Sequence, residues 1–287
     1  MRRAARARRA LLAVATATVA AMLTGCVPAG WFGGAAAAPT ASSDGSVTDD
    51  FDGPAGTNPS GVWTIQTGGG GWGNRELQTY TDDAVFLDGE GHLVIEATIP
   101  QDGSAPTSGR LTTQGAFSFT YGTVTARIQI PDGKGLLPAF WLLGDSLPVL
   151  GWPAAGEIDV IETPSTTDTS VHTVHGPTST GDRWSLSTSI DHLPPLSAGF
   201  HDYAIRKEQG ALTFLIDDEV VFSVRREEAP LTAVWVFDAP FHLLFSLAVG
   251  GNWPGDPDAT TPQTARMLVD WVSYVPLPTP TPTPTAP

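Results

Sequence analysis

The alternation of apolar and polar residues along the chain predicts many short β-strands. Apolar runs rich in β-branched and aromatic residues recur from about residue 48 to residue 275, and turn signals such as Asp132-Gly133 and Gly250-Gly251 separate them. We expect strands at 93–95, 121–130, 139–143, 157–162, 170–175, 200–206, 211–216, 219–224, 241–249 and 267–275.

This succession of strands, without a long amphipathic helix pattern, is typical of an all-β protein. We predict an antiparallel β-sandwich of the jelly-roll kind with a concave substrate cleft, formed as one catalytic domain by residues 48–275. A closed β-barrel is the alternative arrangement of the same strands.

The expected strand at 157–162 carries three carboxylates. Alternate side chains of a strand share a face, so Glu157 and Asp159 lie together. Glu162 has the opposite parity, and it joins them only if one extra residue is inserted. We therefore predict a β-bulge near Val160-Ile161.

Three carboxylates on one face repel one another, so at least one of them should have a raised pKa. A protonated carboxyl beside an ionised one is the pair that hydrolyses a glycosidic bond. The alternatives are a solvated acidic strand or a calcium site. A sugar cleft is also indicated by four tryptophans beside glycine or proline, whose faces can stack on sugar rings: Trp72, Trp141, Trp152 and Trp253.

The net charge of −15 in 287 residues disfavours a nucleic acid as partner. Positive charge gathers at the N-terminus, where arginines precede an apolar run, 10–23, that is too short to span a membrane. We predict a signal peptide of the lipoprotein type at 1–25. The ending Leu23-Thr24-Gly25-Cys26 is similar to a bacterial lipobox, so Cys26 would carry the lipid.

Cys26 is the single cysteine, so we expect no disulfide within the chain. We expect an extracellular protein anchored to the outer face of the cell membrane through this lipid alone; a secreted protein with an incidental cysteine is the alternative. Residues 26–47 are rich in small and polar residues and are predicted to form a flexible tether. Residues 276–287 are predicted to form an extended Pro/Thr-rich tail.

Several ordered blocks resemble one known family. They lie at 73–81, 121–122, 126–128, 131–136, 138–144, 151–153, 156–162, 171–176 and 248–255. Together they resemble glycoside hydrolase family 16, and within it the bacterial laminarinase-type endo-β-1,3-glucanases. Members with the longer acidic motif carry a bulge there, which agrees with the parity of Glu162.

The resemblance implies a retaining mechanism in which Glu157 is the nucleophile and Glu162 the general acid/base. Asp159 would assist between them through a hydrogen bond to Glu157, and no metal is needed for the chemistry. Sugar-binding roles are implied for Asn74, Trp141, Trp152, His175, Asn252 and Trp253. A structural strand-end histidine is the alternative for His175, and His172 is expected to be structural.

Family members often bind a structural calcium ion far from the cleft. The resemblance implies Asp270 as a carboxylate ligand and Gly91 as a backbone ligand; a solvated Asp270 is the alternative. The chain also departs from its relatives, because Leu137, Thr98 and Ser246 replace residues that are frequently tryptophan, arginine and asparagine.

The resemblance thus implies an exported, monomeric endo-hydrolase acting on a polysaccharide, β-1,3-glucan. Two alternatives remain. One is a related activity on mixed-linkage glucan or galactan, or glycosyl transfer. The other is a non-catalytic glucan-binding jelly roll.

Overall fold

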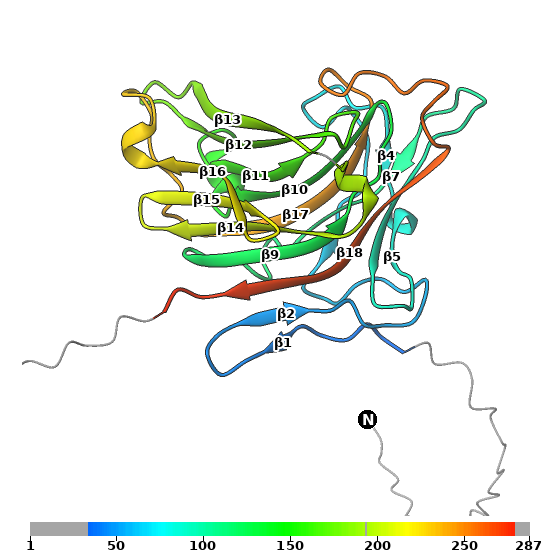
Figure 1. Ribbon diagram of the computed structural model, residues 1–287, viewed down its shortest axis with the longest axis horizontal. Coiled ribbons are helices and arrows are strands. Elements are labelled where there is room, and N and C mark those ends of the chain that lie inside the picture. The colour runs from blue at the N-terminus through cyan, green and yellow to red at the C-terminus, as the bar shows by residue number, and fades with distance from the viewer. Residues whose placement is uncertain (1–33, 193, 279–287) are drawn as a thin grey trace, which may run out of the picture. The chain divides into compact units, whose positions relative to one another are not determined.

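The computed structural model describes residues 34–192 and 194–278, and these residues form two β-sheets packed face to face (Figure 1). The two sheets are separate, so the fold is a sandwich, as predicted, and not a closed barrel. Nearly all strand pairs are antiparallel.

The acidic strand lies in the middle of the smaller, seven-stranded sheet. In order across this sheet the strands are β13 (Arg183–Asp191), β12 (Thr169–Pro177), β11 (Glu157–Glu162), β10 (Leu136–Gly144), β17 (Phe241–Val249), β8 (Arg110–Thr112) and β3 (Thr64–Ile65).

The larger, eleven-stranded sheet covers the other side of the core. Its main path runs β16 (Glu219–Arg225), β15 (Ala211–Ile216), β14 (His201–Glu208), β9 (Gly122–Gln129), β18 (Thr264–Val275), β6 (Leu93–Thr98), β7 (Thr107–Ser108) and β4 (Thr79–Tyr80). The strands β1 (Thr40–Ala41), β2 (Val47–Asp49) and β5 (Val85–Leu87) lie off this path. The helical turns are η1 (Asp82–Ala84), α1 (Leu147–Leu150), η2 (Leu196–Ala198) and η3 (Arg226–Glu228), and no described helix is long and apolar enough to cross a membrane.

Each of the ten expected strands is present, because the apolar side chains that alternate along them fill the space between the sheets. Ile158, Val160 and Ile161 of β11 all belong to this core. Strand β13 was not expected. Its outward positions carry serine and threonine, so its sequence lacks the apolar alternation of a strand that faces only a core.

The predicted tether is wrong in its last part. Residues 40–41 pair with 47–48, and β2 in turn pairs with β18, so this segment adds two short strands to the larger sheet. A composition of small polar residues does not prevent pairing with a strand that is already in place. The predicted signal peptide and Cys26 lie outside the described residues, as does the tail from residue 279.

Candidate active site

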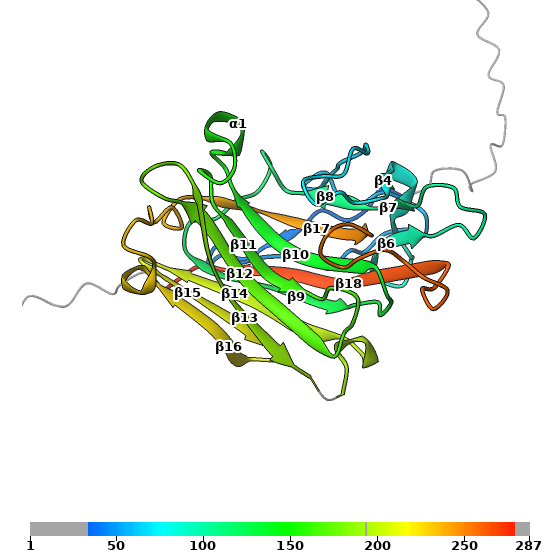
Figure 2. The same ribbon diagram turned by 90° about the horizontal axis from the view of Figure 1, so that it is seen from above.

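A cleft of about 880 Å³ crosses the face of the seven-stranded sheet that is turned away from the core. Strands β13, β12, β11, β10, β17 and β8 line it, together with the segments around 72–76 and 147–152. Figure 2 shows α1 standing above the sheet, in the connection between β10 and β11. The size of the cleft is in the usual range for ligand sites, and the cleft agrees with the concave site expected from the sequence.

The acidic strand β11 contains the predicted bulge. Its register against β10 skips Val160, and its register against β12 shifts between Asp159 and Glu162. Because the extra residue reverses the parity, Glu162 lines the cleft with Asp159 and Glu157, while Val160 and Ile161 both face the core.

The turn into β11 requires glycine. Gly156 has a φ of +83°, and a Cβ added there would lie 2.7 Å from Cγ2 of Val236 and 2.9 Å from Cζ of Phe241. A larger residue would displace the start of the strand, and Glu157 with it.

Burial separates the proton affinities of the three carboxyl groups. The pKa of Glu162 is well above its usual value because the carboxyl is buried and because Asp159 and Glu157 lie nearby. The pKa of Asp159 is also well raised, first by burial and then by Glu157. Burial raises the pKa of Glu157 too, but His175 and Arg110 oppose the rise. Glu157 therefore ionises most readily, while Glu162 keeps its proton.

His175, on β12, lies beside two of the acids, as expected. Its Nε2 is 3.3 Å from Oδ2 of Asp159 and 3.8 Å from Oε1 of Glu157. Its ring centroid is 6.1 Å from that of Trp152. Burial lowers the pKa of His175, and the charge of Glu157 opposes that effect.

The hydrogen bond expected between Asp159 and Glu157 is not among those of the described residues. Oδ2 of Asp159 is buried without a hydrogen-bond partner, and Nε2 of His175 lies 3.3 Å from it. Oxygens of both carboxyl groups and a ring nitrogen of His175 lie within 4.8 Å of one another. Within residues 34–192 and 194–278 this is the one cluster of three side chains with the chemistry and spacing to hold a metal ion.

Arg110 and Glu76 also line the cleft, although neither was singled out from the sequence. The guanidinium carbon of Arg110 lies 4.7 Å from the ring centre of Trp72 and 4.6 Å from that of Trp141. Burial raises the pKa of Glu76, and its charge helps to raise the pKa of Glu162. No local spacing indicates these roles, because the partners are distant along the chain.

Five of the six residues expected to bind sugar line the cleft: Asn74, Trp141, Trp152, His175 and Trp253. Asn252 does not. Its side chain is exposed, and its N–H donates to the carbonyl of Asn74 at 2.8 Å, so its backbone holds the loop of Asn74. The preceding glycine is needed for this approach, since a Cβ on Gly251 would lie 2.7 Å from the same carbonyl oxygen.

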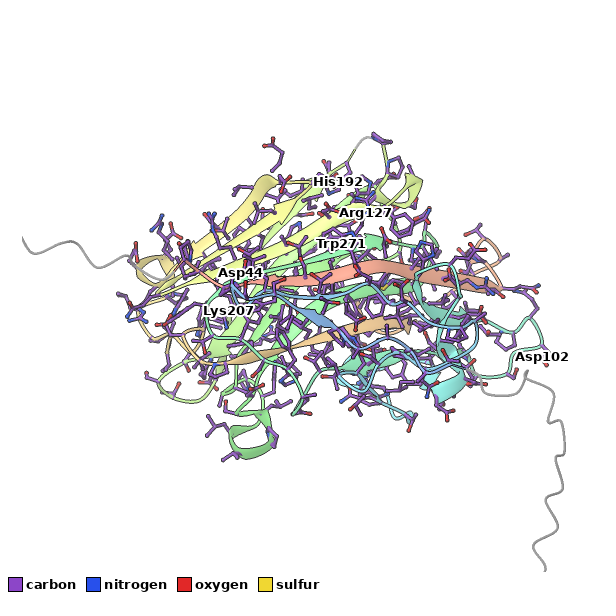
Figure 3. The ribbon with its side chains drawn as sticks, turned by 90° about the horizontal axis from the view of Figure 1, so that it is seen from below. Asp44, Asp102, Arg127, His192, Lys207 and Trp271 are labelled. Atoms are coloured by element: carbon purple, nitrogen blue, oxygen red, sulfur yellow. The ribbon has the colours of Figure 1, made fainter. Side chains whose placement is uncertain are left out.

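The surroundings of Asp270 do not favour calcium. Its Oδ2 lies 3.3 Å from Nε of Arg127, labelled in Figure 3, and Arg127 also donates to Asp202 at 2.8 Å. A guanidinium at this distance competes with a cation for the carboxylate. Gly91 has a φ of +92° in the turn before β6 and lies near Asp52. The calcium ion stays a prediction.

A wide cleft with tryptophan walls and buried carboxyl groups of separated proton affinity defines a glycoside hydrolase. The chain belongs to glycosyl hydrolases family 16, whose model matches residues 74–273.

Known proteins are similar over most of the chain. A β-glucanase of Rhodothermus marinus is 35% identical over 239 residues, which are 78% of this chain and 82% of the relative. The endo-β-1,3-glucanase of Pyrococcus furiosus has a similar structure, with a TM-score of 0.71, 38% identity, and coverage of 80% of this chain and 93% of that one. The laminarinase catalytic domain of Thermotoga maritima has a TM-score of 0.71 and 35% identity, with coverage of 79% and 95%.

Proposed function

We propose that this chain hydrolyses internal bonds of β-1,3-glucan with retention of anomeric configuration. The observation that carries the proposal is the set of three carboxyl groups on β11, which open into one cleft with separated proton affinities. The names of its relatives, β-glucanase and endo-β-1,3-glucanase, support the substrate.

The position of β11 supports cleavage within a polysaccharide. Two lining strands, β13 and β12, lie on one side of it, and β10, β17 and β8 lie on the other. At ~4.8 Å between neighbouring strands, the cleft crosses roughly 24 Å of sheet, with room for sugar rings on both sides of the acids.

In the first step Glu157 attacks the anomeric carbon and forms an ester with it. The bond to the leaving oxygen breaks as Glu162 gives that oxygen its proton. This assigns the ionised group to attack and the buried, protonated group to acid catalysis, in agreement with their pKa shifts.

In the second step Glu162, now ionised, takes a proton from a water molecule as that water attacks the anomeric carbon. The ester breaks, and Glu157 leaves as a carboxylate. His175 favours the carboxylate form of Glu157, since its ring nitrogen lies 3.8 Å from that carboxylate and lowers its pKa. Asp159, within 4.8 Å of both groups, would assist Glu157 between them.

A polysaccharide panel tests the proposal. Digests of laminarin, lichenan and agar should show oligosaccharides from laminarin, and proton NMR of the first products should show the β-anomer. Glu157→Gln should reduce the rate by at least ~10⁴-fold, while Glu219→Gln, at an exposed position on β16, should not. Oligosaccharides from agar alone would overturn the substrate assignment. Glucan binding without new reducing ends would point to the non-catalytic alternative.

We also propose that the protein is exported and held at the outer face of the membrane by a lipid on Cys26. The arginine-rich start, the short apolar run and the sequence before Cys26 support this. Metabolic labelling with a fatty acid should mark the parent protein, and Cys26→Ser should release it into the medium.

A further inference from the structure

His172 lies on the core side of β12, opposite the bulge of β11. Its two chain neighbours line the cleft and pair with Glu162 and Asp159, so the ring of His172 faces the bulged segment between them. The side chain is completely buried, between the two sheets. A polar ring in this position needs a hydrogen-bond partner.

That partner is a backbone carbonyl of the bulge. Nδ1 of His172 lies 2.6 Å from the carbonyl oxygen of Val160. Val160 is the extra residue of β11, which the registers with β10 and β12 both skip. A buried backbone carbonyl without a hydrogen-bond partner destabilises the strand that carries it. The imidazole therefore stabilises the bulged strand over a regular one.

A chain of hydrogen bonds fixes the orientation of this ring. A carbonyl only accepts, so Nδ1 of His172 carries the proton, and Nε2 accepts from the hydroxyl of Ser170 at 2.9 Å. That hydroxyl has then used its proton, and it accepts from Nε2 of His192 at 2.8 Å. His192, labelled in Figure 3, lies at the end of β13. His192 thus donates to Ser170, Ser170 donates to His172, and His172 donates to the carbonyl of Val160 in the bulge.

Burial also keeps the ring of His172 neutral, as this chain requires. It lowers the pKa of His172 to about 4, against the effect of the hydrogen bond to Val160. Near neutral pH the Nε2 acceptor is therefore available to Ser170.

We propose that His172 is a positioning residue, whose hydrogen bond to Val160 holds the bulge that turns Glu162 into the cleft. The inference rests on the acid/base role proposed for Glu162. His172 itself touches neither substrate nor reacting atoms. It acts by keeping Glu162 in place, since a misplacement of a catalytic group by ~1 Å can lower the rate of hydrolysis about 10²-fold.

Comparing kcat/KM on two substrates distinguishes this positioning role from a general loss of structure. When laminarin is cleaved, the departing sugar oxygen is a poor leaving group and needs a proton from Glu162. The dinitrophenolate released from a dinitrophenyl β-laminaribioside leaves without one. Loss of acid catalysis therefore lowers kcat/KM for laminarin and spares kcat/KM for the aryl glycoside. Loss of active fold lowers both equally.

Three variants carry the test. Glu162→Ala is the reference for lost acid catalysis. His172→Leu removes the donor at similar volume, and His172→Asn keeps an N–H at the position of Nδ1. We expect His172→Leu to lose about 10²-fold on laminarin and less than about 3-fold on the aryl glycoside. We expect His172→Asn to restore most of the laminarin activity.

The outcomes are distinguishable. If Glu162→Ala fails to spare the aryl glycoside, the proposed function is wrong. If Glu162→Ala spares it but folded His172→Leu loses both substrates equally, or loses neither, His172 is not a positioning residue. Should His172→Leu not fold, Ser170→Ala removes the donor that orients the ring, and a smaller loss confined to laminarin is expected; an equal loss on both substrates overturns the inference.

Discussion

Glu162 lies half-buried in the wall of the cleft at the end of β11, in surroundings where an ionised carboxylate is costly. The burial that raises its pKa allows it to act as an acid. It also means that the folded state loses stability at high pH, where this carboxyl ionises. Asp159 is buried beside it with an unpartnered oxygen, so the centre of the cleft holds two carboxyl groups that folding favours only when they are protonated.

Replacing Glu162 by Gln should therefore stabilise the fold at high pH while abolishing hydrolysis. A carboxyl whose pKa is raised on folding contributes stability that is complete below its unfolded pKa of ~4.3 and is lost as the pH rises through the folded pKa. Gln has no proton to lose. As the pH rises through the raised pKa of Glu162, the free energy of unfolding of the parent should therefore fall relative to that of the variant.

Urea unfolding at several pH values measures this difference. Glu219→Gln, exposed on β16, is the matched control and should follow the parent. A parallel pH dependence of the Glu162 variant and the parent would show that burial does not shift the proton affinity of this carboxyl.

At the scale of the element, the parity of β11 decides which side chains meet. The strand has one residue too many for its neighbours, and that residue brings Glu162, the sixth residue of the strand, onto the same face as Glu157, the first. Gly156 permits the close turn into the start of the strand. His172, on the neighbouring strand, donates a hydrogen bond to the carbonyl of the bulge.

Changing the length of β11 by one residue in each direction should have unequal effects. Deleting Val160 places Glu162 four positions after Glu157, on the same face of a regular strand. Inserting an alanine between Ile161 and Glu162 either turns Glu162 to the core or, if the bulge is lost, moves it roughly 7 Å along the cleft. We expect measurable activity in the deletion variant and none in the insertion variant.

The deletion should also reduce stability by ~2–4 kcal/mol, because it removes a buried valine and leaves His172 without its acceptor. Laminarin hydrolysis well below the melting temperature of each variant, together with urea unfolding, separates the two effects. An active insertion variant beside an inactive deletion variant would contradict the parity argument.

At the scale of the whole folded region, the larger sheet supports the sheet that carries the site, and the N-terminal segment completes that support. Asp49 of β2 is buried. Its carboxylate accepts from Nε1 of Trp63 at 2.9 Å and from Oγ of Ser60 at 3.2 Å. These bonds join the N-terminal strands to the core, and none of the three residues lines the cleft.

A chain that begins at residue 50 should therefore be less stable than one that begins at residue 34, although its cleft is unchanged. Loss of β2 leaves residues 272–274 of β18 paired on one side only, with β9, and it leaves Trp63 without its acceptor. We expect a destabilisation of ~3 kcal/mol, or about 6–12 °C in melting temperature. Calorimetry measures it, and kcat on laminarin at low temperature should be equal in both chains. Equal melting temperatures would mean that residues 34–49 only link the domain to what precedes it.

The sequence by itself determined the strands that alternate toward the core, the sandwich, the acidic strand and its bulge. It did so because period-two burial and the parity of Glu162 are local properties that a single strand displays. Among the strands it missed are β13 and β2, whose polar residues pair only because a finished neighbouring strand is present.

The tertiary structure alone decided the rest of the site. Arg110 lies between Trp72 and Trp141, Asn252 does not line the cleft, and His172 donates to Val160. Each of these depends on residues that are distant along the chain or on a backbone group that has no side-chain signature. Sequence patterns report which face a residue takes, and only packing between elements determines which atoms on that face meet.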